Sequence, residues 1–253
     1  MLEIRGLSRR FGGLLAVGGI DLSLKEGEIF SIIGPNGAGK TTTFNLICGQ
    51  LRPSSGHIAF QGTDISGWSP HAVAQAGIAR TFQSTRLFGG LSVLENVLIS
   101  CYCRTRVGLF GALLRSAGFR REERESRESA GELLEFVGLQ GEQQRQASDL
   151  PTEIQQRLAI ALALATKPRL LLLDEPTGGM NDEEVERLVA LIRKVRDTGV
   201  SVGLIEHRMK VVMGISDRVV VLDHGVKIAE GSPAQVQENP VVIGAYLGTE
   251  EGK

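Results

Sequence analysis

The segment GPNGAGKTTT, residues 34–43, carries glycines, a lysine and threonines at the spacing G-x-x-x-x-G-K-T. Such glycines let successive backbone N–H groups point at phosphate oxygens, the lysine reaches the outer phosphates, and the first threonine offers a hydroxyl to Mg²⁺. The apolar run IFSII precedes the segment and the helix-like FNLICG follows it, which is the context this chemistry needs. We therefore predict a nucleotide site built from Gly34, Pro35, Asn36, Gly37, Ala38, Gly39, Lys40, Thr41 and Thr42.

Two adjacent carboxylates, Asp174 and Glu175, end the apolar run of RLLLLDEP. Four leucines indicate a buried strand that delivers both acids at its end, near the phosphate segment if the two strands are neighbours. Asp174 would hold Mg²⁺, and Glu175 would orient or deprotonate an attacking water. The alternative is a strand that simply ends in a solvated acidic turn.

A histidine follows a third apolar run, in GLIEHR, where His207 could contact the terminal phosphate of a nucleotide. A lone histidine is usually structural. Here polar groups follow three apolar strand candidates, and this convergence favours a hydrolytic site over three unrelated features.

Composition restricts the class of protein. The chain has 253 residues, enough for one large domain or two small lobes, and its net charge of −1 argues against a nucleic-acid surface. The longest apolar stretches, LAIALALA and GLFGALL, are far shorter than the ~20 residues that span a bilayer. We expect a protein of the cytosol, and a partner that does the spanning if it works at a membrane. The three cysteines lack metal-ligand spacing and are assigned no chemistry.

The pattern of elements predicts an α/β fold. Residues 1–63 show period-2 strand segments, and the stretch from about 70 to 165 turns helical and reads as a separate lobe. Strand candidates then follow at 169–175, 200–207 and 217–225, the first two separated by a helix that Asn181 or Asp182 caps. Apolar strands alternating with helices indicate a buried parallel sheet, with the phosphate segment at its carboxyl end.

These motifs resemble the ATP-binding subunits of ABC transporters over nearly the whole chain. GPNGAGKT is similar to Walker A, LLLLDE to Walker B, Gln83 in ARTFQ to the Q-loop glutamine, GGMN (178–181) to the D-loop, and His207 to the switch histidine. The resemblance implies ATP and Mg²⁺ as ligands, with Phe11 stacking on adenine. It implies catalytic roles for Glu175, His207 and Gln83, and a metal held by Thr41, Gln83 and Asp174.

The same resemblance implies one ABC domain over residues 1–253, with a P-loop NTPase core, a parallel sheet and an antiparallel β subdomain. Residues 1–83 and 166–253 would form the core with its β subdomain, and residues 84–165 an inserted helical lobe that contains the signature region. Two ATP-binding subunits would dimerise head to tail so that two ATP molecules lie between them.

Within this family, RTFQ, LSVLENVLI, the segment from EHRMK to PAQVQ, and NPVVIGAYLG resemble the branched-chain amino acid uptake group. The implied function is to power import of hydrophobic amino acids through separate membrane subunits, from the cytoplasmic face of the membrane, with a periplasmic or extracellular substrate-binding protein and no nucleic acid. Related ATPases for urea uptake or lipopolysaccharide export remain alternatives. So do a soluble ABC ATPase outside transport and a module that binds ATP without hydrolysing it.

The signature departs most from the family, in which it reads like L-S-G-G-Q. The spacing to Asp174 places it at Leu150, Pro151, Thr152, Glu153 and Ile154, so proline replaces the serine and glutamate the second glycine. We expect TEIQ (152–155) to form a capping box that satisfies its own N–H groups. At ~4 Å and an effective dielectric of about 20, the glutamate would oppose one phosphate charge by about 4 kcal/mol unless it swings into solvent. The sequence therefore predicts a different chain as the partner ATPase, with two unequal sites.

Overall fold

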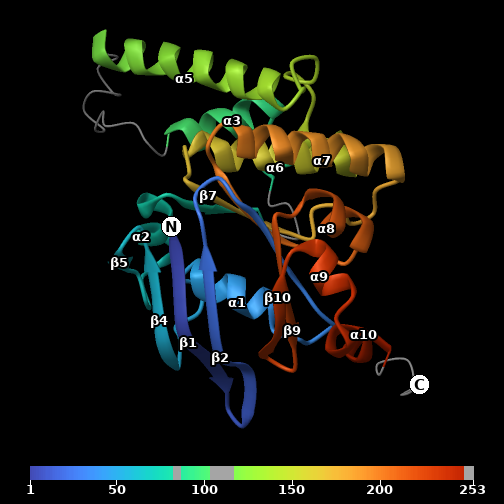
Figure 1. Ribbon diagram of the computed structural model, residues 1–253. Coiled ribbons are helices and arrows are strands. Elements are labelled where there is room, and N and C mark those ends of the chain that lie inside the picture. Colours follow the sequence, from blue (N-terminus) through green and yellow to red (C-terminus); the bar gives the residue numbers. More distant parts are fainter. Residues whose placement is uncertain (82–86, 103–116, 248–253) are drawn as a thin grey trace.

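The computed structural model describes residues 1–81, 87–102 and 117–247. A six-stranded sheet forms its centre, in the order β10-β9-β3-β8-β7-β6 (Figure 1). Every neighbouring pair in it is parallel except β9 and β10. Its strands are β3 (Ile29–Ile33), β6 (Ile78–Arg80), β7 (Leu170–Asp174), β8 (Ser201–Ile205), β9 (Arg218–Asp223) and β10 (Val226–Gly231). The parallel sheet predicted from the leucine- and valine-rich runs is thus confirmed.

A second, antiparallel sheet lies beside the first, in the order β2-β1-β4-β5. Its strands are β1 (Leu2–Phe11), β2 (Leu14–Leu24), β4 (Ser55–Phe60) and β5 (Thr63–Asp64). Helix α1 (Lys40–Ile47) shares one apolar core with both sheets, since Phe44 packs in the same buried cluster as Leu2 and Phe30. The phosphate segment at the start of α1 therefore lies between the two sheets.

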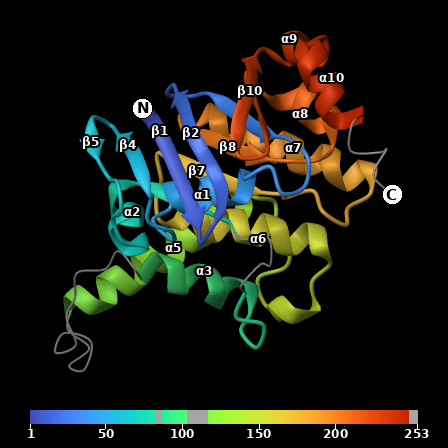
Figure 2. The ribbon, with the colours of Figure 1, turned by 90° about the horizontal axis from the view of Figure 1, so that it is seen from below.

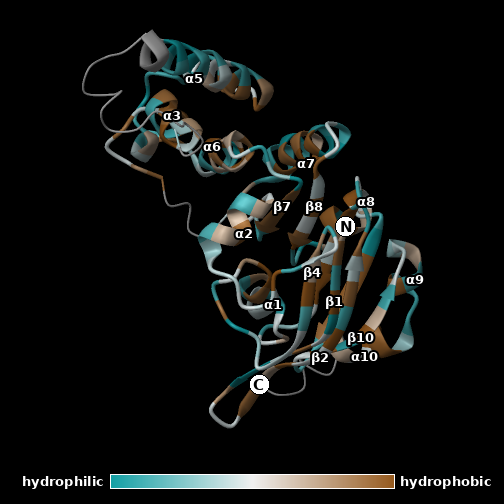
Figure 3. Cartoon of the chain, turned by 90° about the vertical axis from the view of Figure 1, so that its left-hand side faces the viewer, coloured by the Kyte–Doolittle hydropathy of each residue, from teal (hydrophilic) through white to brown (hydrophobic). Residues whose placement is uncertain are grey.

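The longest of the described helices lie together, away from the antiparallel sheet (Figure 1). Helices α3 (Val93–Tyr102), α5 (Ala117–Phe136) and α6 (Thr152–Ala165) pack on one another at one end of the molecule, next to α7 (Asp182–Asp197) (Figure 1). Most of α5 is hydrophilic, in contrast to the apolar strands (Figure 3). No helix within the described ranges is long and apolar enough to cross a membrane. That residues 84–165 form a lobe separate from the core stays a prediction.

Short helices complete the fold. Helix α2 (Pro70–Ala76) precedes β6, and α8 (Met209–Ile215) follows β8. Helices α9 (Pro233–Gln237) and α10 (Pro240–Leu247) pack against β10, well away from α3 (Figure 2).

Residues 78–80 differ from the helical pattern expected from about 70 onward, because they form β6 at the edge of the parallel sheet. Gly77, with φ +105°, ends α2 in the left-handed conformation that favours glycine, and Ile78 then pairs with Leu170 of β7. Three residues are too few to show the period-2 pattern. The pairing also joins segments about 90 residues apart, which local patterning cannot reveal.

Candidate active site

Three parallel strands bring the predicted groups to one edge of the sheet. β3 leads into the phosphate segment, β7 ends at Asp174, and β8 is followed by His207. The strand order places β8 between β3 and β7, so β3 and β7 are not neighbours. All three strands nevertheless point the same way, and their carboxyl ends meet at the edge where open α/β folds bind ligands.

Glycines give the phosphate loop its shape. Gly34 has φ +147°, and a Cβ added to it would lie 2.0 Å from the carbonyl oxygen of Leu222. Gly39 has φ +94°, and its added Cβ would lie 2.5 Å from the carbonyl oxygen of Ala16. Only glycine fits such close backbone contacts, so the loop is held tightly between β9 and the antiparallel sheet.

Lys40 is buried at the start of α1, and its Nζ donates to the carbonyl oxygens of Gly34 and Pro35 at 2.8 and 2.9 Å. Burial lowers the pKa of Lys40, while the carboxylates of Glu175 and Asp174 raise it. The ammonium is thus held inside the loop it would serve, within electrostatic range of both acids.

Asp174 is almost fully buried and forms an ion pair with Arg80 of β6, whose Nη2 donates to its Oδ2 at 2.7 Å. Burial raises the pKa of Asp174, and the hydrogen bond and charge of Arg80 act in the opposite direction. Its second oxygen, Oδ1, is buried and has no hydrogen-bond partner among the residues that the structure describes. A buried carboxylate oxygen left unpaired fits a divalent cation.

Glu175 and His207 meet directly: His207 Nε2 lies 2.5 Å from Glu175 Oε1. Glu175 has φ +49°, an unusual conformation for a residue other than glycine, and strain of this kind concentrates at functional sites. Both side chains remain partly exposed, so a water molecule and a phosphate can reach them. Sequence reasoning predicted both residues, and the structure brings their side chains into contact, while their catalytic roles stay predictions.

Two further residues at this edge were not predicted. Arg80 joins Asp174 to α1, because its Nη1 donates to Asn45 Oδ1 at 2.5 Å. Glu206 is buried beside His207 and accepts hydrogen bonds from Thr177 and from the backbone that follows it. The place of Arg80, three residues before Gln83, could have pointed to it. Nothing in the sequence pointed to Glu206, because an acid that follows an apolar strand is usually solvated.

The roles of the predicted site residues all stay predictions, and those of Phe11 and Gln83 have the least structural detail beside them. Phe11 lies at the end of β1 with 43% of its surface exposed, and the guanidinium of Arg9 stacks over its ring at 4.7 Å. An exposed aromatic ring there could stack on a base. Gln83 lies outside the described residues.

The structure corrects the predicted capping box of the signature. Thr152 is the first residue of α6 and Pro151 precedes it as the N-cap, so no side chain caps the helix. Gln155 instead turns its Nε2 toward the carbonyl oxygen of Leu150 at 2.9 Å. Pro151, with φ −57° and ψ 155°, has the extended conformation of an N-cap, so the helix starts one residue earlier than the capping box requires and the box does not form.

Glu153 also differs from the sequence-based expectations. Its side chain does not point into solvent, and its carboxylate is not left without a compensating charge. Only 5% of it is exposed, and its Oε1 lies 3.5 Å from Arg157 Nε and 3.4 Å from Arg187 Nε. Two arginines therefore compensate this carboxylate within the chain. The repulsion of about 4 kcal/mol expected for an uncompensated charge does not apply.

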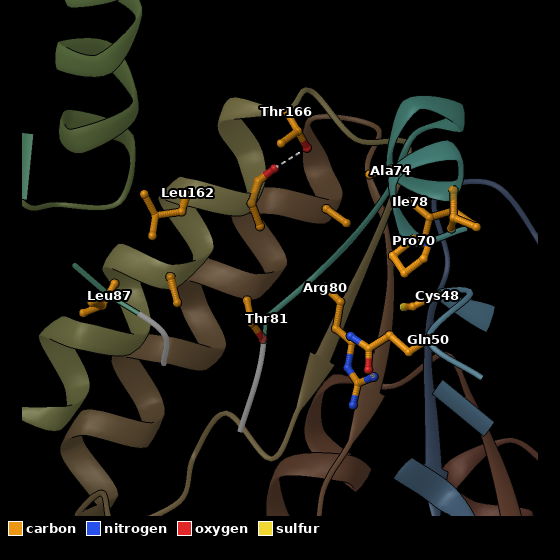
Figure 4. Close-up of a pocket in the computed structure, with 14 residues that line it drawn as sticks. Cys48, Gln50, Pro70, Ala74, Ile78, Arg80, Thr81, Leu87, Leu162 and Thr166 are labelled. Atoms are coloured by element: carbon orange, nitrogen blue, oxygen red, sulfur yellow. Dashed lines mark hydrogen bonds between the residues drawn. The ribbon is translucent and has the colours of Figure 1, made fainter. Parts of the chain in front are cut away.

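A pocket of about 330 Å³ lies beside Arg80, between α2, β6 and α6 (Figure 4). Its walls are mostly apolar, with Val73, Ile78 and Leu162 among them, and Arg80 and Gln50 lie at its polar end. The pocket therefore lies between α6 and the edge of the sheet where Arg80 pairs with Asp174.

Comparisons with known proteins agree with this geometry. Residues 17–178 match the ABC transporter family, and residues 226–252 match the family described as branched-chain amino acid ATP-binding cassette transporter. The chain is 46% identical, over 98% of both chains, to the high-affinity branched-chain amino acid transport ATP-binding protein BraF of Pseudomonas aeruginosa. It is 45% identical, with the same coverage, to the protein LivG of Escherichia coli K12 that carries the same description.

Solved structures show the same fold. The chain superposes with a TM-score of 0.86 on the ADP conformation of MJ1267, an ATP-binding cassette of an ABC transporter, at 30% identity and with 98% of each chain covered. A nucleotide-free ATP-binding cassette from an ABC transporter gives the same TM-score and identity, covering 97% of this chain and 98% of that one. The chain therefore belongs to the ABC transporter family, among the ATP-binding proteins of its branched-chain amino acid transport group.

Proposed function

We propose that this protein binds ATP at the edge formed by β3, β7 and β8 and hydrolyses it to power the import of branched-chain amino acids. The observation that carries this proposal is the contact between Glu175 and His207, 2.5 Å apart, at the edge that also holds Lys40 and Asp174. A protein that only bound ATP would need the phosphate loop but not this pair. The full-length likeness to BraF and LivG supports the amino acid cargo.

In the proposed reaction, the loop N–H groups and Lys40 hold the outer phosphates of ATP, and Phe11 stacks on the adenine. Glu175 accepts a hydrogen bond or the proton from the attacking water, and His207 donates to the terminal phosphate. Lys40 must exchange its bonds to the loop carbonyls for bonds to phosphate, which costs little because both partners are oxygens.

Mg²⁺ fits the residues present. Asp174 Oδ1 is buried without a partner in the described part of the chain, the hydroxyl of Thr41 is exposed at the start of α1, and Gln83 is the third candidate ligand. When bound, Mg²⁺ would neutralise charge on the phosphates of ATP. Arg80 keeps Oδ2 of Asp174 occupied, so that Oδ1 is left for the metal.

We further propose that the protein works at the cytoplasmic face of the membrane, bound to membrane-spanning permease subunits and served by a periplasmic or extracellular binding protein. Phe88 is 56% exposed, its backbone hydrogen-bonds to Asn96 of α3, and its ring offers an apolar contact point for a permease. Phe88→Glu should lower recovery of the protein with membranes while ATP binding persists. Unchanged recovery of that variant would exclude this surface.

The partner ATPase is proposed to be a different chain. Pro151 lacks the hydroxyl of the family serine, and the buried carboxylate of Glu153 occupies the place of a glycine. ATPase rates should be compared for the isolated chain, for the chain with Pro151→Ser and Glu153→Gly, and for the chain with its natural partner. Fast ATP hydrolysis by the isolated chain, at a rate that Pro151→Ser and Glu153→Gly do not change, would contradict the proposed asymmetry.

The test of the transport function is uptake into proteoliposomes that contain the permease, the partner ATPase and this protein. ATP inside the vesicles should drive uptake of leucine, isoleucine or valine delivered by the binding protein, and Lys40→Ala should abolish it. Uptake of urea instead, or outward movement of a lipid, would assign the protein to a related transport system.

A further inference from the structure

Glu206 is a buried carboxylate to which the proposed reaction gives no role. It directly follows β8, it is 3% exposed, and the next residue is His207. A carboxylate taken out of water is costly unless hydrogen bonds satisfy its oxygens. The bonds that stabilise it therefore indicate what it does.

Both oxygens of Glu206 are occupied, and each faces a different loop. Oε1 accepts from the backbone N–H of Thr177 at 3.0 Å and from its hydroxyl at 2.5 Å. Oε2 accepts from the backbone N–H groups of His207 at 3.0 Å and of Arg208 at 3.3 Å. Thr177 belongs to the turn after β7, and the other two residues belong to the turn after β8.

These two turns carry the proposed catalytic pair. Glu175 lies two residues before Thr177, and His207 follows Glu206 directly. One carboxylate thus fixes the turn of the acid and the turn of the histidine relative to each other. The pair carried by these two turns is in contact, with 2.5 Å between His207 Nε2 and Glu175 Oε1.

The same contacts reach the segment 178–181. The N–H of Met180 donates to the carbonyl oxygen of Thr177 at 3.3 Å, and Arg208 Nη2 donates to the carbonyl oxygen of Met180 at 2.5 Å. The segment 178–181 that resembles the D-loop is therefore tied, through Thr177, to the carboxylate that holds the histidine turn.

We propose that Glu206 is a positioning residue for ATP hydrolysis. Its hydrogen bonds connect the turn after β8 to the turn after β7, and through this connection it holds His207 in place. This inference rests on the proposed roles of Glu175 and His207. Within the described residues, the hydrogen bonds of Glu206 go to Thr177 and to the backbone of the turn after β8, and not to residues 34–42 or to the side chains of Glu175 and His207. It should therefore affect the rate of the chemical step and not the binding of ATP.

The test is a double-mutant cycle of Glu206→Gln and His207→Ala, measured in the complete complex with the partner ATPase and permease. Glutamine keeps the size but presents an N–H₂ group where the carboxylate accepts from N–H donors, so one turn must shift. Misplacement on this scale costs about 10- to 100-fold in rate. We expect kcat to fall by that factor while the KM for ATP and the affinity of the isolated chain for a non-hydrolysable analogue stay unchanged.

In the His207→Ala background, Glu206→Gln should lower kcat by less than about 3-fold, because residues that act as one unit give non-additive losses. Equal losses in both backgrounds, or no loss in the single variant, would overturn the proposal. If His207→Ala itself leaves kcat unchanged, the proposed role of the histidine fails first, and that result is separate from a failure of Glu206 alone.

Two more variants keep the test decisive. Glu28→Gln makes the same change at another largely buried glutamate, which pairs with Arg218 far from the site, and should lower thermal stability without changing kcat. Thr177→Val removes a single donor to Glu206 and leaves its carboxylate in place. If Glu206→Gln does not fold, Thr177→Val should still lower kcat, again only where His207 is present, and additive losses there would refute the proposal.

Discussion

Removing the carboxylate of Glu153 should destabilise the folded chain, because two arginines then lose their shared partner. Arg157 is mostly buried and Arg187 is half exposed. Loss of one partner from a fully buried ion pair costs about 3–5 kcal/mol, while exposed pairs contribute up to about 1 kcal/mol. Glu153 lies between these cases, so Glu153→Ala should cost about 2 kcal/mol. For a chain of this size that lowers Tm by about 4–8 °C.

The assay is thermal unfolding of Glu153→Ala beside Glu183→Ala. Glu183 is an exposed acid 3.9 Å from Arg187, on the same helix, and its removal should change the free energy of unfolding by less than about 0.5 kcal/mol. A double-mutant cycle with Arg187→Ala should show a coupling of about 0.5–1 kcal/mol. Equal Tm values for Glu153→Ala and the unmodified protein would refute the conclusion that the two arginines compensate this carboxylate. Glu153 would then again be expected to repel a phosphate at the signature.

Three further changes test the fold, two of them at the parallel strands beside the site and one at the Glu28–Arg218 ion pair. Arg80→Met should cost about 3–5 kcal/mol, measured by urea unfolding, because it leaves Asp174 buried without its cation. Gly203→Ala should cost about 1–3 kcal/mol in the same assay, since its Cβ would lie 2.5 Å from a leucine side chain of β7. Burial raises the pKa of Glu28, but hydrogen bonds, that of Arg218 first, outweigh it and hold the pKa below its ordinary value. The stability from this pair is complete above about pH 4.3 and is lost as the pH falls through the lower folded-state pKa, so Arg218→Met should flatten the acid limb of the stability curve.

Much of the fold follows from local patterns. The strand segments predicted within residues 1–63 and the candidates at 169–175, 200–207 and 217–225 form strands. Asn181 caps α7 in a capping box with Glu184. Both features are predictable because apolar periodicity and helix-start residues act over a few neighbours. The phosphate loop is equally local, since its glycines, lysine and threonine are consecutive.

The unpredicted parts depend on long-range contacts. The strand β6 exists because Ile78 finds Leu170, and Arg80 gains its role only when β6 lies beside Asp174. Glu206 looks like a solvated acid in the sequence, and becomes a buried acceptor because the turn after β7 folds over it. Such pairings join residues far apart in the chain, so spacing gives no sign of them.

The signature shows a local rule that fails. Thr152 and Gln155 have the spacing of a capping box, but Pro151 takes the N-cap position and the helix begins one residue earlier than the pattern indicates. Glu153 was expected to act as an uncompensated charge, yet Arg187 reaches it from α7. The one-residue shift of the helix start thus removes the predicted capping box, and the contact between α6 and α7 removes the predicted repulsion.

The most direct test of the proposed hydrolytic site is Glu175→Gln in the assembled transporter. Glutamine can accept a hydrogen bond from the attacking water but cannot take its proton, and a general base contributes about 10²- to 10⁴-fold to the rate. The variant should therefore bind ATP as tightly as the unmodified protein and lose hydrolysis by that factor, whereas Lys40→Ala should lose the nucleotide itself. ATP turnover by Glu175→Gln at the unmodified rate would contradict the site described above.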